Sequence, residues 1–249
     1  MSKVAIIVAL EREIAPLINH QPWHAVKLIP SPYRNYESNY GFIVCSGIGG
    51  VAARKAAEEV LGRVGPSLLI SAGIAGSLTP GWKVGDVIAP AAVVPLGGTP
   101  KKTVSLPEIP GLQRGGTLVS ASTIAGPEEK TNLATQYQAD VIDMEAGFVA
   151  EVAAAHDVPF AAVKAISDEH DFPLPDLGRF VASDGRFRTN RFVVYSMLHP
   201  MTWPAVCRLA RNTTKASREL SRVLRVLLTT GALGAALPSG VSSSGAVNI

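Results

Sequence analysis

The sequence is poor in cysteine: Cys45 and Cys207 are the two cysteines in 249 residues. They are too few and too widely separated to form a disulfide framework or the paired cysteines of a zinc site. Cys45 lies in an apolar segment typical of a buried strand. We therefore expect neither disulfides nor a metal centre.

An excess of one charge and long apolar segments are also missing. The formal net charge is +3, which is too small to indicate a nucleic-acid partner. No apolar run is long enough to span a bilayer. Residues 4–10 are apolar, but charged residues 11–13 follow at once, unlike a secretory signal. These absences favour a cytoplasmic protein.

Short apolar segments that favour strands alternate with segments that favour helices. The clearest strands are residues 3–10, 41–45, 67–70 and 161–168, and the clearest helices are 51–61 and 146–156. This alternation predicts an α/β fold in three layers, with a mixed, mainly parallel central sheet covered by helices on both faces. We expect one domain over residues 1–228.

Three other segments are expected to be less regular. Residues 20–40 are polar, aromatic and proline-containing, which predicts a hairpin or surface loops. Residues 71–76 contain two glycines and are expected to form a tight turn after the strand at 67–70. Residues 90–117 are expected to form a long loop or irregular β segment that lines a site.

The C-terminal part contains an amphipathic helix pattern over residues 205–228. Basic residues recur along one side at three- and four-residue steps: Arg208, Arg211, Lys215, Arg218, Arg222 and Arg225. The pattern fits a final helix packed on the sheet with a solvated basic face. It also fits a surface that meets anionic lipid. Residues 229–249, rich in Gly, Ala and Ser, are expected to be a flexible tail.

A loop-like segment precedes this helix and follows Asp168. We expect residues 168–191 to form a flap over the site. Phe172, Leu174 and Phe180 are the apolar side chains that would contact lipid if the protein meets a membrane.

Acidic residues lie at the ends of two predicted strands and at the start of a predicted helix. Glu13 follows the first strand, Asp143 and Glu145 flank Met144 ahead of the helix at 146–156, and Asp168 ends the strand at 161–168. Ligands of parallel α/β sheets bind beyond the carboxyl ends of strands, so these acids are candidates for catalysis. Each acid alone also fits a structural role at a helix N-terminus.

Six separated segments together resemble the nucleoside phosphorylase-I superfamily, and within it the methylthioadenosine/S-adenosylhomocysteine nucleosidases. The segments are residues 6–13, 46–53, 71–76, 83–88, 143–146 and 165–168. The resemblance implies a phosphorylase-like fold, cleavage of the N-glycosidic bond of a purine nucleoside, no cofactor, and a homodimer. Residues 168–180 and the basic tail around Trp203 further resemble the hopanoid-associated phosphorylases, which implies release of adenine from adenosylhopane, a lipid-linked nucleoside.

The resemblance also implies catalytic roles. Asp168 matches the general acid that protonates N7 of the leaving purine, and Ser167 would orient it. To act in this way Asp168 must hold a proton near neutral pH, which burial favours. Asp168→Asn is therefore expected to slow adenine release and to leave folding little changed. Glu13 matches the residue that binds and deprotonates the attacking water.

The sugar and the base have matching residues as well. Glu145 would accept both ribose hydroxyls, a charge-assisted contact that favours positive charge at C1′. Met144 would pack beneath the ribose. Asp143, Gly73, Ser71 and Ile124 are expected to line the substrate site. Ile124 stands where relatives carry an aromatic residue against adenine.

Two departures bear on the acceptor. Lys164 replaces an arginine of the nucleosidases, and the two residues are not equivalent. Ser71 and Ile74 stand where hexameric phosphorylases carry a phosphate-binding pair. Hydrolysis is therefore favoured over phosphorolysis, with phosphate the alternative co-substrate and Lys164 or Arg54 its candidate contact. Methylthioadenosine is the alternative substrate. Outside enzymes, the alternative is a nucleoside-binding, membrane-associated protein.

Overall fold

The computed structural model describes residues 4–20, 22–27, 33–96, 103–173 and 203–235, together with residues 180, 188, 195, 199 and 201. The strands are β1 (Val4–Val8), β2 (His24–Val26), β3 (Arg34–Ser38), β4 (Gly41–Cys45), β5 (Leu68–Ser77), β6 (Val87–Pro95), β7 (Val104–Ser105), β8 (Gln113–Ser120), β9 (Ala139–Asp143) and β10 (Phe160–Asp168). The helices are α1 (Glu11–Ile18), α2 (Gly50–Val64), α3 (Pro127–Tyr137), α4 (Ala146–Ala155), α6 (Trp203–Thr230) and α7 (Ala232–Ala235).

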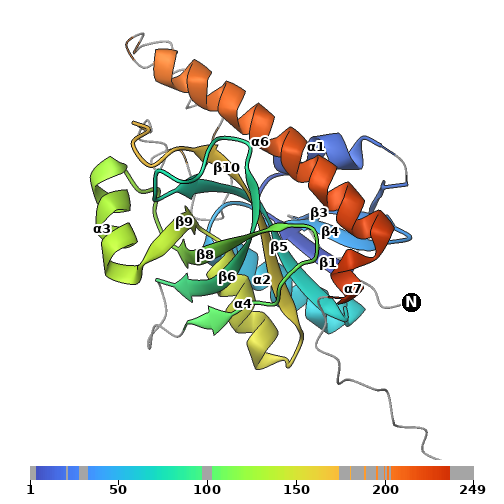
Figure 1. The fold of residues 1–249 in the computed structure, drawn as a ribbon. Helices are drawn as coiled ribbons and strands as arrows, with labels where there is room; N and C mark the ends of the chain where they lie inside the picture. The colour runs from blue at the N-terminus through green and yellow to red at the C-terminus, as the bar shows by residue number, and fades with distance from the viewer. Residues whose placement is uncertain are drawn as a thin grey trace, which may run out of the picture.

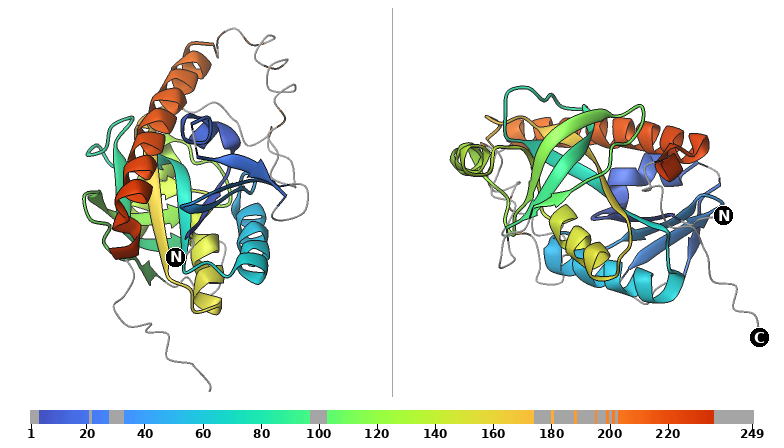
Figure 2. Two further views of the ribbon diagram at one scale, coloured as in Figure 1. Left: turned by 90° about the vertical axis from the view of Figure 1, so that its right-hand side faces the viewer. Right: turned by 60° about the horizontal axis from the view of Figure 1, so that its bottom comes forward.

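The strands form one mixed sheet that lies between two layers of helices (Figures 1 and 2). Buried side chains of α1 and α6 share a core with one face of the sheet, and those of α2 and α4 share a core with the other. Helix α3 lies beside β8 and β9 in a smaller third cluster. The predicted three-layer α/β fold is thus confirmed.

The sheet closes on itself around β5. This strand pairs in parallel with β1 and β10 and in antiparallel with β9. Strand β10 also pairs with β6, which continues through β8 back to β9. The sheet continues from β5 outside this ring, in the order β1, β4, β3 and β2. Because Gly76 of β5 pairs with both Ile142 and Asp168, closure brings the ends of β9 and β10 together.

Helix α6 has the amphipathic character that its sequence predicts. Its apolar residues Leu220, Leu224 and Leu227 are buried in the same core as Ile14 and Leu17 of α1. The six basic residues from Arg208 to Arg225 are exposed on the opposite side. The helix therefore packs on the fold through one face and presents a basic face to solvent. None of the helices in the described segments is long and apolar enough to cross a bilayer.

Several local predictions were wrong. Residues 71–76 form part of the long strand β5, not a turn, because they continue the pairing of this strand with β1, β10 and β9. Strand β6 continues to Pro95 and β8 begins at Gln113, so residues 90–117 are more regular than predicted. The hairpin prediction for residues 20–40 is confirmed by the antiparallel strands β2, β3 and β4.

The segments on either side of α6 also differ from expectation. Phe172 and Phe180 are buried, each with 5% of its surface exposed, so they are not placed to contact lipid. Leu174 and most of the predicted flap lie outside the described residues. At the other end α6 continues to Thr230, α7 follows, and Leu233 is buried in the core. The start of the predicted tail is therefore part of the fold, and residues 236–249 lie outside the described part.

Candidate active site

A cavity of about 750 Å³ opens where β1, β9 and β10 end, between α1, α3 and α6. Four acidic residues line it: Glu13, Asp143, Glu145 and Asp168. They come from three separate places in the chain, since Asp143 and Glu145 are two residues apart, and closure of the sheet around β5 brings the ends of β9 and β10 together. Most of the other lining side chains are apolar. Such a mixture of an apolar wall and a few convergent polar groups is typical of small-molecule sites.

Glu13 lies in the first turn of α1, and 4% of its surface is exposed. Burial raises the pKa of Glu13 to about 8, and the nearby charge of Glu145 acts in the same direction. Lys164 and a hydrogen bond from the backbone of Ile74 act in the opposite direction, with smaller effect. A carboxylate with this pKa is a much stronger base than an exposed one, as proton removal from water requires.

Glu145 is held at the N-terminus of α4 by two backbone groups. The Gly49 N–H donates to Oε1 at 2.7 Å, and the Met144 N–H donates to Oε2 at 3.2 Å. Burial and the neighbouring charge of Asp143 raise the pKa of Glu145 to about 7. Gly49 has φ of +97°, a conformation that favours glycine, and this orients its N–H toward Glu145. The glycine-containing segment at 46–50 thus positions a carboxylate.

Asp143 takes part in a buried polar network rather than projecting freely into the cavity. Its Oδ2 accepts from Lys164 Nζ at 2.8 Å and from the Ala146 N–H at 2.9 Å, and its Oδ1 accepts from the Ser120 hydroxyl. Lys164 Nζ also donates to the Ser71 hydroxyl at 3.0 Å. Buried charges of this kind require paired partners. The network fixes the start of α4 and therefore the position of Glu145.

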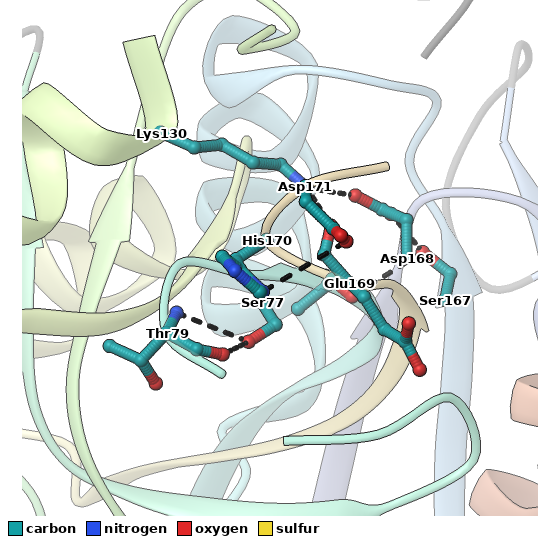
Figure 3. Close-up of polar contacts among 9 residues, drawn as sticks. Ser77, Thr79, Lys130, Ser167, Asp168, Glu169, His170 and Asp171 are labelled. Carbon is teal, nitrogen blue, oxygen red and sulfur yellow. Dashed lines mark hydrogen bonds and ion pairs between the residues drawn. The ribbon is translucent and has the colours of Figure 1, made fainter. Parts of the chain in front are cut away.

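Asp168 ends β10 at a register shift between Ile166 and Asp168. Such irregularities redirect side chains, and here Ser167 and Asp168 are both buried. The Ser167 hydroxyl donates to Asp168 Oδ1 at 2.7 Å. On the other carboxylate oxygen, Oδ2, Asp168 accepts from Nζ of Lys130, which reaches across from α3 (Figure 3). The proposed acid therefore forms a buried ion pair.

The predicted residues fall into two groups in the structure. Those that line the cavity are Glu13, Ile124, Asp143, Met144, Glu145, Ser167 and Asp168. Ser71, Gly73 and Lys164 are outside its lining and lie behind Glu13 and Asp143. Arg54 pairs with Glu151 on α4 and is also outside the lining. Lys164 and Arg54 are the two candidates for a phosphate contact. Neither of them therefore faces the cavity as a free cation.

Two sets of lining residues were missed from the sequence. Lys130 stands in the first turn of α3, where a lysine is ordinarily exposed, yet only 1% of its surface is accessible. Val206, Leu209 and Thr213 of α6 form one wall of the cavity. Their spacing marks a helix face, but no pattern in the sequence indicated that this face would meet the strand ends rather than the core.

Comparison with known families agrees with the geometry. A model of the phosphorylase superfamily matches residues 3–110 and 110–191. The chain belongs to this superfamily and is an enzyme of its nucleosidase-like type. It is 31% identical over 160 residues to a 5′-methylthioadenosine/S-adenosylhomocysteine nucleosidase of Haemophilus influenzae, which covers 51% of this chain and 67% of the relative. The corresponding protein of Buchnera aphidicola is 26% identical over 200 residues, 68% of this chain and 86% of the relative.

Solved structures show the same fold. The 5′-methylthioadenosine nucleosidase of Arabidopsis thaliana superimposes with a TM-score of 0.72 at 18% identity, covering 96% of this chain and 98% of the other. The Neisseria meningitidis 5′-methylthioadenosine/S-adenosylhomocysteine nucleosidase, solved with methylthio-immucillin-A, gives 0.69 at 19% identity, covering 92% and 100%. At these identities the similarity is one of fold.

Proposed function

We propose that this protein releases adenine from a 5′-substituted adenosine by hydrolysis. Nucleosidase chemistry is supported by the superfamily membership and by the curated nucleosidase relatives. The observation that carries the proposal is that Glu13, Glu145 and Asp168 line one cavity. A protein that only bound nucleosides would not need a strongly basic carboxylate and a buried carboxylate ion pair in the same site.

The three carboxylates divide the reaction between them. Water attacks C1′ as the bond from C1′ to N9 breaks, and the bonding electrons leave with the purine. Glu13 takes a proton from the water. Glu145 accepts the ribose hydroxyls and stabilises positive charge that develops on the sugar. The site around Asp168 protonates N7, so that the base leaves as neutral adenine.

Water is the acceptor that this cavity favours. Lys164 is neutralised by Asp143, and Arg54 is engaged by Glu151. In their ionised forms, which the reaction requires, Glu13 and Glu145 would repel phosphate at the place where an acceptor attacks. Phosphorolysis remains the alternative, and the sugar product distinguishes the two reactions.

The 5′ substituent is proposed to be apolar. A cavity of about 750 Å³ exceeds the volume of a nucleoside, and Val206 and Leu209 of α6 contribute an apolar wall. Within this class, the resemblance to hopanoid-associated phosphorylases supports adenosylhopane, and methylthioadenosine is the second candidate. We assign Asp143 a positioning role, because its oxygens already accept from Lys164, Ala146 and Ser120.

The test is an adenine-release assay on purified protein. Methylthioadenosine, S-adenosylhomocysteine and 5′-alkyladenosines of increasing chain length are compared with and without phosphate, and the sugar product is identified. We expect adenine and a free sugar, with kcat/KM increasing with apolar chain length. Formation of a sugar 1-phosphate, or strict dependence on phosphate, would refute hydrolysis. If the protein binds these nucleosides but releases no adenine, it is a nucleoside-binding protein and not an enzyme acting on them.

We also propose that α6 brings the protein to an anionic membrane surface. Met201 and Trp203 at its N-terminal end are 95% and 53% exposed, next to the part that lines the cavity. In Figures 1 and 2 this end of α6 extends beyond the sheet. Exposed apolar and basic side chains together suit the interface of a bilayer. The implied homodimer stays a prediction, to be checked by analytical ultracentrifugation.

A further inference from the structure

Lys130 is a buried lysine in an unfavourable place. It lies in the first turn of α3, where the helix dipole disfavours positive charge, and 1% of its surface is exposed. Burying an ammonium group costs free energy that a single ion pair does not reliably recover. A hydrophobic side chain would serve the fold at least as well. The position is therefore better explained by the chemistry of the cavity that Lys130 lines.

The contacts of Lys130 leave it ready to donate. Its Nζ has three N–H groups and no acceptor. Among the described residues, Nζ donates to Asp168 Oδ2 and to the Glu169 carbonyl, the latter at 2.9 Å (Figure 3). One N–H remains for a ligand in the cavity. Asp168, by contrast, accepts on both oxygens, from Ser167 and from Lys130.

Strand β5 has a glycine, Gly76, where it lies against the Lys130–Asp168 pair. A Cβ atom at Gly76 would lie 2.8 Å from Asp168 Oδ2 and 3.3 Å from Lys130 Nζ. A side chain at this position would displace both groups. Glycine at 76 therefore gives the ammonium and the carboxylate a common place at the cavity wall, where the end of β10 meets β5.

We propose that Lys130 is a catalytic residue that donates the proton to N7 of the leaving purine, and that Asp168 holds and orients it. This inference rests on the proposed function. One Nζ–H bond breaks and one N7–H bond forms as C1′–N9 cleaves, so the base departs neutral. Lys130 is left as an amine beside Asp168 and regains a proton from solvent after release. Glu13 separately receives and later releases the proton from water.

The alternative assignment makes an opposite prediction for Lys130→Met. If Asp168 were the donor, removal of the neighbouring cation would favour its protonated form, and adenine release would be maintained or increased. If Lys130 is the donor, adenine release falls by about 10²-fold or more. Exposed Lys55 on α2 provides the control, since Lys55→Met also removes one lysine and should leave the rate of adenine release unchanged.

A substrate with a good leaving group separates acid catalysis from structural damage. Cleavage of 4-nitrophenyl β-D-riboside still needs Glu13 and Glu145 but no protonation of the leaving group. Lys130→Met should therefore keep its nitrophenolate release within about threefold of wild type while losing adenine release. Parallel loss of both activities, or retention of adenine release, would overturn the proposal. If Lys130→Met folds poorly, Lys130→Gln, which can still donate a hydrogen bond to Asp168 but has no acidic proton, repeats the comparison.

A binding measurement distinguishes this inference from the proposed function. Calorimetry compares adenine with 7-deazaadenine, which lacks the N7 acceptor. Wild type should bind adenine at least about tenfold more tightly, and Lys130→Met should bind the two alike. Equal affinities in wild type would refute the contact with Lys130. Preference for adenine without any adenine release would keep that contact and refute the proposed nucleosidase function.

Discussion

Glu13 lies directly against Gly73 of β5. A Cβ atom at position 73 would come within 2.8 Å of Glu13 Oε2. The first glycine of segment 71–76 is thus needed for the position of a carboxylate from α1, 60 residues earlier, and not for a turn. This contact links the sequence segment to the chemistry, because a displaced Glu13 cannot hold the attacking water where Glu145 holds the sugar.

Gly73→Ala should reduce kcat by about tenfold to 10²-fold, because small displacements of a catalytic group are costly. Since the substrate contacts of Glu145 are unchanged, KM should change little. Steady-state adenine-release kinetics measure both constants. Gly62→Ala on α2, where a Cβ meets nothing within 4 Å, is the matched control and should keep full activity. If Gly73→Ala keeps the kcat of wild type, the added Cβ does not displace Glu13 from its catalytic position.

Glu13→Gln should lose catalytic activity and gain thermal stability. Between pH 4.5 and about 8 the folded protein retains a proton on Glu13 that the unfolded chain has released. The contribution of this group to stability is therefore full below pH 4.5 and is lost as pH rises through about 8. Glutamine removes that loss, so the variant should melt at least about 2–4 °C above wild type at pH 9, and less at pH 5.

Calorimetric melting across this pH range tests the expectation, together with an adenine assay that should fall by about 10²-fold or more. Exposed Glu58 on α2 offers Glu58→Gln as the control, with no comparable pH-dependent gain. A variant whose melting temperature follows that of wild type at every pH would indicate that Glu13 ionises freely in the folded protein.

We expect kcat/KM to rise as the pH increases toward the basic range. Burial raises the pKa of Glu13 to about 8 and of Glu145 to about 7, and both must be ionised to act. We expect kcat/KM to increase from pH 6 to about 8, with apparent values that belong to the coupled pair. In Glu13→Asp this rise should move to a different pH, because the shorter side chain is buried differently. A flat profile from pH 6 to 8 would contradict these roles.

Asp168→Asn should be both inactive and less stable. The sequence alone predicted little change in folding, but the side chain of Lys130 is 1% exposed and would lose its carboxylate. Breaking a buried pair from one side costs about 3–5 kcal/mol, whereas Lys130→Met/Asp168→Asn should recover most of it. A double-mutant cycle by urea unfolding measures this coupling. Additive effects would mean that the pair contributes no interaction in solution.

Membrane contact through α6 is tested by sedimentation with liposomes. Wild type should bind vesicles of anionic lipid at low salt and dissociate as salt screens the charges. Arg211→Gln/Lys215→Gln/Arg222→Gln should reduce binding by about tenfold or more. The control with equal charge loss on other exposed surfaces is Lys27→Gln/Lys55→Gln/Arg63→Gln. Failure of wild type to sediment with anionic vesicles at low ionic strength would leave α6 a purely structural helix.

The α/β class, the amphipathic helix α6 and the acids near the strand ends could all be predicted from the sequence. These features are local: apolar runs, three- and four-residue spacing, and the residue that follows a strand are all visible along the chain. The six short segments of family resemblance added predicted roles for Glu13, Glu145 and Asp168, and the superfamily match confirms the family.

How these groups meet depends on the folding of the whole chain. Ring closure around β5 makes Gly76 a neighbour of both Ile142 and Asp168, a relation among residues up to 92 positions apart. It also buries Lys130 against Asp168, although its place in the first turn of a helix predicts an exposed lysine. Such pairings depend on how a sheet curves and which helix covers its end. These are collective consequences of packing, and no short segment of sequence contains them.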